Sequence, residues 1–166
     1  ISYPLTLGMC SPIGDGAAAA VIVSENFAKR MSQNRLVKVR ASVLNSGWDY
    51  EDNQPGVTET VANQAYDLAE VGPEELDVVE LHDASAPAEL MYYETLGLCP
   101  KGEGASFIRE GHSKLGGKTP VNPSGGLLRK GHPVGATGLA QVHELVTQLR
   151  GEAGKRQVDN AKIGLA

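Results

Sequence analysis

The strongest constraint on the fold is the segment Asn122–Gly138, NPSGGLLRKGHPVGATG, which runs directly into a helical pattern. Five of its seventeen residues are glycine and two are proline, so backbone freedom and a fixed dihedral alternate along it. His132 stands between Gly131 and Pro133 at the mouth of that helix. Free amides and the positive end of a helix dipole favour a base or hydrogen-bond donor there. On spacing alone, a solvated histidine in a tight turn or a phosphate cradle remains an alternative, although the P-loop and GxGxxG orders are absent.

Composition excludes several classes of protein. The chain has 166 residues, 41% of them hydrophobic, which suits one domain with a real core or part of a larger one. A net charge of −5 and the lack of long basic runs argue against nucleic-acid binding. Two cysteines without CxxC spacing predict neither a disulfide framework nor a zinc site. The apolar run AAAAVIV is too short to span a membrane. We therefore expect a reducing compartment, the cytoplasm, or the peroxisome in a eukaryote.

Periodicity predicts alternating strands and helices. Strands are expected at 20–24, 35–47, 77–83 and 161–166. Helices are expected at 58–72, started by Thr58 and ended by Gly72, at 85–97, capped by Ser85, and at 136–151, with a short helical turn opened by Pro73 between the first two. The last helix should bury one apolar face: Leu139, Val142, Leu145, Val146 and Leu149. The stretches 47–56 and 100–131 are expected to be irregular.

This order of elements indicates an α/β layered domain with a mixed sheet flanked by helices. In such sheets the working crevice lies beyond the carboxyl ends of the strands, where loops enter helices. His82 ends the strand at 77–83, and His132 precedes the helix at 136–151. We therefore predict that these two histidines share one cleft.

Three motifs, in the same order along the chain, resemble the thiolase family. They are CSPIGDGAAAAVIVSE (10–25), ELHDASAPAELMYYETLGLCPKGEG (80–104) and NPSGGLLRKGHPVGATGLAQ (122–141). The last is most similar to the sterol-carrier or lipid-transfer branch. The resemblance implies a layered α-β-α-β-α fold of two similar halves, usually dimeric. Residues 1–30 would be the tail of the first half, and 31–166 the C-terminal domain, truncated before its last strands.

The resemblance also implies the chemistry. Thiolases act on acyl-CoA or 3-ketoacyl-CoA thioesters through an acyl-cysteine, with coenzyme A as a substrate and no other cofactor. The nucleophilic cysteine would lie upstream of Ile1, and the isolated chain would be inactive. His132 would activate that cysteine and His82 would help to form the oxyanion hole. Asp83 would orient His82 or cap the next helix, and Gly131, Pro133 and Gly135 would shape the loop.

One position departs from the branch. Its members carry His-Asp-Cys-Phe, where the cysteine is the proposed acid/base, and this chain has Ala84 and Ser85 instead. Alanine cannot move a proton, so two alternatives stay open. The first is a thiolase-like aldolase that cleaves steroid side-chain coenzyme A thioesters with an OB-fold partner, in which tyrosines serve. The second is a non-catalytic lipid-binding protein.

The remaining candidates are weaker. Arg129 and Lys130, beside the histidine loop, are the best-placed cations for an anionic thioester. Glu80 and His82 lack a third partner, so no metal is predicted. The pair Tyr92 and Tyr93 is expected to pack in the core. Trp48, in the loop at 47–56, would line the substrate entrance or pin the loop.

Overall fold

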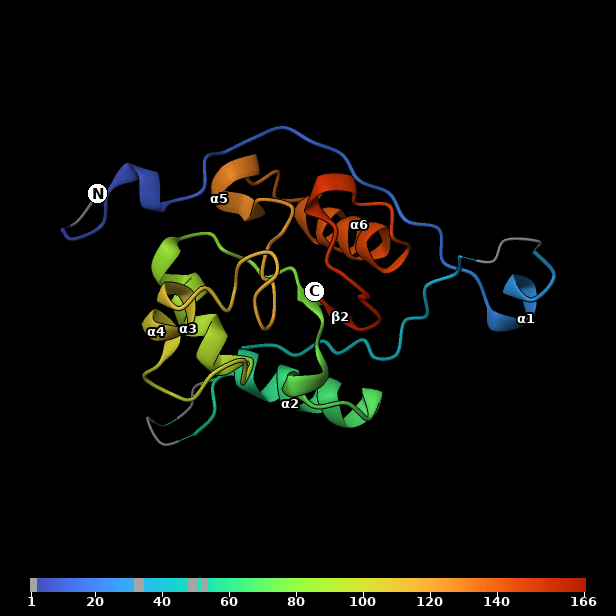
Figure 1. Cartoon of the computed structure of the whole chain (residues 1–166), viewed down its shortest axis with the longest axis horizontal. Helices are drawn as coiled ribbons and strands as arrows, with labels where there is room; N and C mark the ends of the chain where they lie inside the picture. The colour runs from blue at the N-terminus through green and yellow to red at the C-terminus, as the bar shows by residue number, and fades with distance from the viewer. Residues whose placement is uncertain (1–2, 32–34, 48–50, 52–53) are drawn as a thin grey trace.

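The fold is built around a two-stranded parallel sheet. The computed structural model describes residues 3–31, 35–47, 51 and 54–166 (Figure 1). In it, β1 (Val78–Val79) pairs with β2 (Gly164–Leu165), with Val78 opposite Gly164 and Val79 opposite Leu165. Successive side chains of a strand point to opposite faces. Val78 accordingly packs with Leu145 on one side, and Val79 joins a larger cluster on the other.

The described residues form six α-helices and three 3-10 turns. They are α1 (Glu25–Ala28), α2 (Val57–Ala69), α3 (Ala86–Thr95), α4 (Gly104–Arg109), α5 (Gly126–Lys130) and α6 (Thr137–Leu149), with 3-10 turns η1 (Leu7–Met9), η2 (Pro73–Glu75) and η3 (Gly154–Arg156). Helices α2, α3 and α4 pack on the Val79 side, and α6 packs on the Val78 side. The layered α/β class predicted from the sequence is confirmed.

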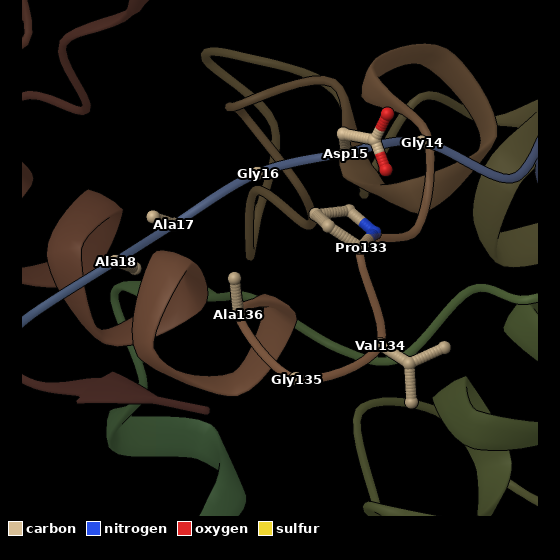
Figure 2. A pocket seen from close by; sticks show the side chains of 9 residues that line it. All are labelled: Gly14, Asp15, Gly16, Ala17, Ala18, Pro133, Val134, Gly135 and Ala136. Carbon is tan, nitrogen blue, oxygen red and sulfur yellow. The ribbon is translucent and has the colours of Figure 1, made fainter.

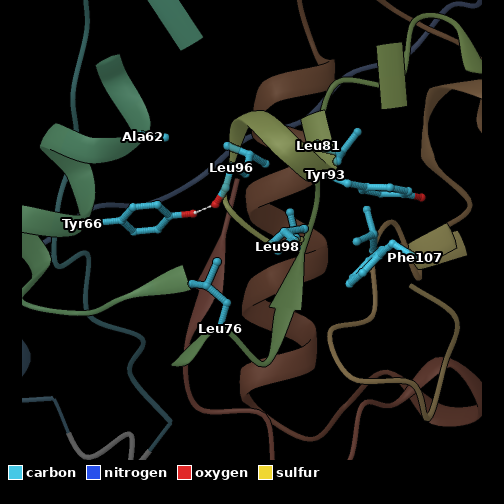
Figure 3. Packing of buried hydrophobic residues seen from close by; sticks show 10 residues of the cluster. Ala62, Tyr66, Leu76, Leu81, Tyr93, Leu96, Leu98 and Phe107 are labelled. Carbon is cyan, nitrogen blue, oxygen red and sulfur yellow. Dashed lines mark hydrogen bonds between the residues drawn. The ribbon is translucent and has the colours of Figure 1, made fainter. Parts of the chain in front are cut away.

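The larger core cluster lies between α2, α3, α4 and β1 (Figure 3). Tyr93 is fully buried in it and packs on Phe107 with 5.1 Å between ring centroids, while Tyr92 packs against its edge. The Tyr66 hydroxyl donates to the Leu96 carbonyl at 2.8 Å, which ties α2 to the end of α3. The predicted packing role of the tyrosine pair is confirmed.

The helix ends agree only partly with the predicted limits. Ser85 caps α3 as predicted, since its Oγ accepts from the Ala88 amide at 3.4 Å. Helix α2, in contrast, has Gly56 at its N-cap, and Thr58 lies inside the first turn. It ends at Ala69 because Glu70 adopts the left-handed conformation with φ of 54°, so the predicted end at Gly72 is wrong.

Two predicted strands are wrong. Residues 20–24 and 35–47 form no strand, because the described parts of the chain offer them no neighbouring strand, and Ser24 instead caps α1. A strand exists only when a neighbour takes up its amides and carbonyls. Several of their apolar side chains are exposed, among them Val21, Ile22, Val39 and Leu44. The two other predicted strands shrink to β1 and β2.

The predicted inner face of α6 is only partly right, since Val146 and Leu149 are partly buried. Leu145 is buried, but Leu139 is 42% and Val142 37% exposed, and the buried side chains include Gln141, Glu144 and Gln148. The reason is a polar network. Gln148 donates to the Arg156 carbonyl at 2.8 Å and accepts from the Val158 amide at 2.8 Å, while Glu144 pairs with the Arg156 guanidinium at 3.0 Å. Buried polar groups are stable when they are bonded in this way, as Glu144 and Gln148 are. Gln141 is outside the network, and its Nε2 has no partner among the described residues.

The stretch 100–131 is less irregular than predicted, because it holds α4 and α5. Each is stabilised by a carboxylate from a distant element. Glu94 of α3 accepts from the Gly104 amide at 2.9 Å. Hydrogen bonds from the backbone of Gly102 and Gly104 lower the pKa of Glu94. The Asp83 carboxylate accepts from the Leu127 amide of α5 at 2.7 Å. Trp48, a candidate at the entrance, lies outside the described residues.

Candidate active site

His82 and His132, which were predicted to share one cleft, lie in direct contact. Their Nε2 atoms are 3.3 Å apart, and the rings meet edge to face with centroids 4.8 Å apart and planes at 84°. His82 is exposed and His132 is partly buried. Because one Nε2 must donate and the other accept, the pair is a ready path for a proton.

Two loops carry the pair, and a third segment fastens them together. His82 follows β1, and His132 precedes α6. The extended segment 10–16 crosses both loops: the Ser11 amide donates to the Ala84 carbonyl at 2.9 Å, and the His132 amide donates to the Pro12 carbonyl at 2.9 Å. Isolated bridges join Cys10 to Ser85 and Ile13 to His132. The segment 10–16 therefore fixes the distance between the histidine loops.

Asp83 anchors the second loop from the first. Its carboxylate accepts from the Leu127 amide at 2.7 Å and from the Leu128 amide at 3.3 Å, and the residue is only 2% exposed. Of its two predicted tasks, capping is the one observed, but on α5 rather than on the next helix. Gly126 (φ of 60°) makes this approach feasible, because a Cβ there would overlap the carboxylate.

Glu80 binds the same turn at Ser124, three residues before the Leu127 amide that Asp83 binds. It is 1% exposed, and its carboxylate accepts from the Ser124 amide at 3.0 Å and the Ser124 hydroxyl at 2.7 Å. Burial raises the pKa of Glu80, although the Ser124 bonds and the Lys130 charge act in the opposite direction. Two buried carboxylates on the chain that leaves β1 thus fix residues 124–128, from which the His132 loop departs.

The backbone of the histidine loop is only partly as predicted. Gly131 has φ of 88° and lies against the Pro12 carbonyl, so it needs to be glycine. Gly135 has no positive φ, and a Cβ at that position would meet no atom within 4 Å, so no such requirement holds there. Pro133 packs against Gly16. Figure 2 shows the segment 14–18 passing over residues 133–136, which together line an open hollow of about 450 Å³.

The two predicted cations are exposed next to this loop. The Lys130 ammonium donates to the Ser124 hydroxyl at 2.6 Å and so belongs to the Glu80 cluster. Arg129 lies on the preceding position of α5, and its role toward coenzyme A stays a prediction. The histidines outside the pair are accounted for: His112 contacts the Glu110 carboxylate at 3.2 Å, and His143 is exposed on α6.

One residue that the sequence analysis missed touches the pair. The Thr137 hydroxyl, buried at the start of α6, lies 2.8 Å from His132 Nδ1. The sequence pattern that indicates this contact is a hydroxyl residue in the first turn of a helix, five positions after a histidine. Among the described residues, no group of three or more His, Cys, Asp or Glu side chains could hold a metal ion. No helix in those residues is long and apolar enough to cross a membrane.

Comparison with known proteins places this geometry in a family. The model of the family "Thiolase C-terminal domain-like" matches residues 49–166. The chain belongs to the thiolase family. It is 46% identical over 165 residues to the benzoylsuccinyl-CoA thiolase subunit BbsB of Thauera aromatica, which covers 96% of this chain and 42% of that protein. It is 44% identical over 170 residues to sterol carrier protein 2 of Oryctolagus cuniculus, covering 97% of this chain and 31% of that protein.

These similarities confirm the thiolase-like fold and the sterol-carrier and lipid-transfer kinship that the motifs predicted. The chain spans well under half the length of both relatives. A solved structure, the Ltp2-ChsH2(DUF35) aldolase, superposes with a TM-score of 0.58 and 29% identity over 63% of this chain and 26% of that one. Thiolases and an aldolase are thus both among the similar proteins.

Proposed function

We propose that this chain supplies the histidine half of a thiolase-type acyl-transfer site in an acyl-CoA acyltransferase of lipid or sterol metabolism. The observation that carries the proposal is the contact between His82 and His132, 3.3 Å apart at Nε2. The nucleophilic cysteine lies in another part of the polypeptide. Cys10 and Cys99 are not assigned this role; burial raises the pKa of the Cys99 thiol, which makes it a poor nucleophile.

The two imidazoles divide the work. His132 Nε2 takes the proton of the cysteine thiol, and the thiolate attacks the thioester carbonyl. His82 donates a hydrogen bond to the oxygen as it becomes negative. When the intermediate collapses, the carbon–sulfur bond to coenzyme A breaks, and the His132 imidazolium returns the proton to the departing thiolate. An acyl-cysteine remains on the protein.

The surrounding residues keep this geometry. Asp83 and Glu80 hold the turn before His132, and the segment 10–16 ties both loops. Arg129 is an exposed cation next to the loop, and it would meet the phosphates of coenzyme A. We further propose that the protein acts as a homodimer, as is usual in the family.

Trapping the acyl-enzyme tests the proposal. The complete polypeptide is incubated with an acyl-CoA and analysed by intact-protein mass spectrometry. We expect a mass increase of one acyl group in the wild type and in H143A, which removes an exposed histidine of α6, and its loss in H132A. An adduct that forms equally in H132A refutes the role of His132 as the activating base.

A second candidate is an aldolase that works with an OB-fold partner. It is favoured by the similarity to the Ltp2-ChsH2(DUF35) aldolase and by Ala84, which stands where the branch has its acid/base cysteine. The discriminating measurement is affinity purification from native extract followed by a carbon–carbon cleavage assay. A stoichiometric small partner and cleavage without any acyl adduct support the aldolase; an adduct without a partner supports the transferase. A protein that shows neither activity and binds lipid supports the non-catalytic alternative.

A further inference from the structure

The hydroxyl of Thr137 touches two groups at once. Its Oγ1 lies 2.8 Å from His132 Nδ1 and 3.1 Å from the Pro133 carbonyl oxygen. The residue is only 6% exposed, so water does not readily replace either contact. These two contacts constrain each other, because a hydroxyl has one proton to donate and a carbonyl can only accept.

Both contacts are hydrogen bonds only when the Pro133 carbonyl takes the hydroxyl proton and the Thr137 oxygen acts as an acceptor. His132 Nδ1 must then carry the proton that fills this bond. In a neutral imidazole only one nitrogen is protonated, so Nε2 of His132 has a free lone pair. The remaining contact follows: His82 Nε2 carries a proton and donates it to His132 Nε2 across 3.3 Å.

We infer that Thr137 is a positioning residue that holds His132 in the Nδ1–H tautomer, so that Nε2 faces His82 and the substrate as a proton acceptor. The inference rests on the proposed function for its consequence, since Nε2 is the atom assigned to accept the thiol proton. The tautomer itself is a property of the resting protein and can be measured without any turnover. It also assigns opposite states to the two rings, with His132 as acceptor and His82 as donor.

The packing of α6 makes this assignment specific to one threonine. Thr147 of the same helix also bonds its hydroxyl to the carbonyl four residues earlier, that of His143, at 2.8 Å, and it is not among the contacts of the histidine pair. The chain thus offers a matched control with the same residue type, helix and backbone bond. The variants T137V and T147V each remove one hydroxyl with little change in volume, and T137S keeps the hydroxyl.

The test is a long-range proton–nitrogen correlation spectrum of the protein labelled with 15N-histidine, recorded at alkaline pH, where free imidazole is neutral. We expect a protonated Nδ1 and an unprotonated Nε2 for His132 in the wild type, T147V and T137S. In T137V we expect the population to shift toward the Nε2–H tautomer by roughly 2- to 12-fold, the worth of one neutral hydrogen bond. Circular dichroism and the unchanged signals of His112 and His143 show that T137V is folded.

Two results overturn the inference. The first is an unprotonated Nδ1 in the wild type, in which case the hydroxyl donates to the ring and the Pro133 carbonyl keeps only the amides of Ala136 and Thr137. The second is a tautomer that is the same in T137V and T147V. A kinetic arm adds that T137V, rescued by T137S, slows acylation with little change in KM. If no acyl-enzyme forms in any variant while the tautomer shifts, the proposed function fails and the role of Thr137 stands.

Discussion

Replacing Gly126 by alanine should be severely destabilising, because the position is restricted in two independent ways. Its φ of 60° is left-handed, which costs a residue with a Cβ about 1 to 2 kcal/mol. The new Cβ would also overlap the Asp83 carboxylate, whose position is fixed by the amides of Leu127 and Leu128 at 2.7 and 3.3 Å. A bond to a charged group contributes about 1.5 to 3 kcal/mol, and the longer of the two contributes less. We therefore expect G126A to cost about 3 to 6 kcal/mol.

The assay is chemical denaturation followed by circular dichroism, supported by thermal melting, in which the melting temperature should fall by roughly 10 °C or more. G138A is the matched control, since Gly138 lies in α6 with open space around it and no positive φ. Alanine there should be neutral or stabilising by up to about 1 kcal/mol. The clash is isolated by repeating G126A in a D83A background, where only the left-handed term of about 1 to 2 kcal/mol should remain. A cost that is equal in both backgrounds refutes the reasoning.

Two further predictions concern buried titratable groups. Y66F should lose about 1 to 3 kcal/mol, because the buried Leu96 carbonyl loses its donor, while Y3F at a 96% exposed position should be neutral in the same denaturation assay. Burial, with Glu74 as the smaller cause, raises the pKa of Tyr66 to about 12, so its contribution is complete below pH 10 and should be lost as pH rises through 12, a trend that Y66F should lack. Burial also raises the pKa of Glu80 above its ordinary 4.5, so its contribution is complete below pH 4.5 and is lost as pH rises through the raised value. E80Q should flatten this part of the stability profile; a profile with an unchanged slope would show that another group titrates there.

Much of the candidate site could be predicted because the rules that place it are local. A histidine that ends a strand and a histidine that opens a helix come to the same edge of a layered α/β domain. This rule predicts that His82 and His132 lie together, and their Nε2 atoms are 3.3 Å apart. Ser85 as a cap and Pro73 at the start of a turn follow from propensities that act within four residues.

The wrong predictions depend on distant partners, which a local pattern does not contain. The β-branched run at 35–47 reads as a strand, yet it pairs with no strand among the described residues. The apolar stripe of α6 reads as its inner face, yet Gln148 and Glu144 face inward because the loop at 153–158 satisfies them. The cap that Asp83 places on α5 joins residues 44 positions apart, and no short motif encodes it.

The central claim is that the imidazoles of His82 and His132 form one site, in which His132 takes the thiol proton and His82 stabilises the oxygen that becomes negative. A double-mutant cycle of H82A, H132A and the combined variant, read as kcat/KM for acyl transfer by the complete polypeptide, tests it most directly. Since the oxygen that His82 stabilises becomes negative only after His132 has activated the thiol, we predict that the combined variant is about as slow as H132A alone. Losses that multiply, so that each substitution has its full effect in the absence of the other, would contradict the account.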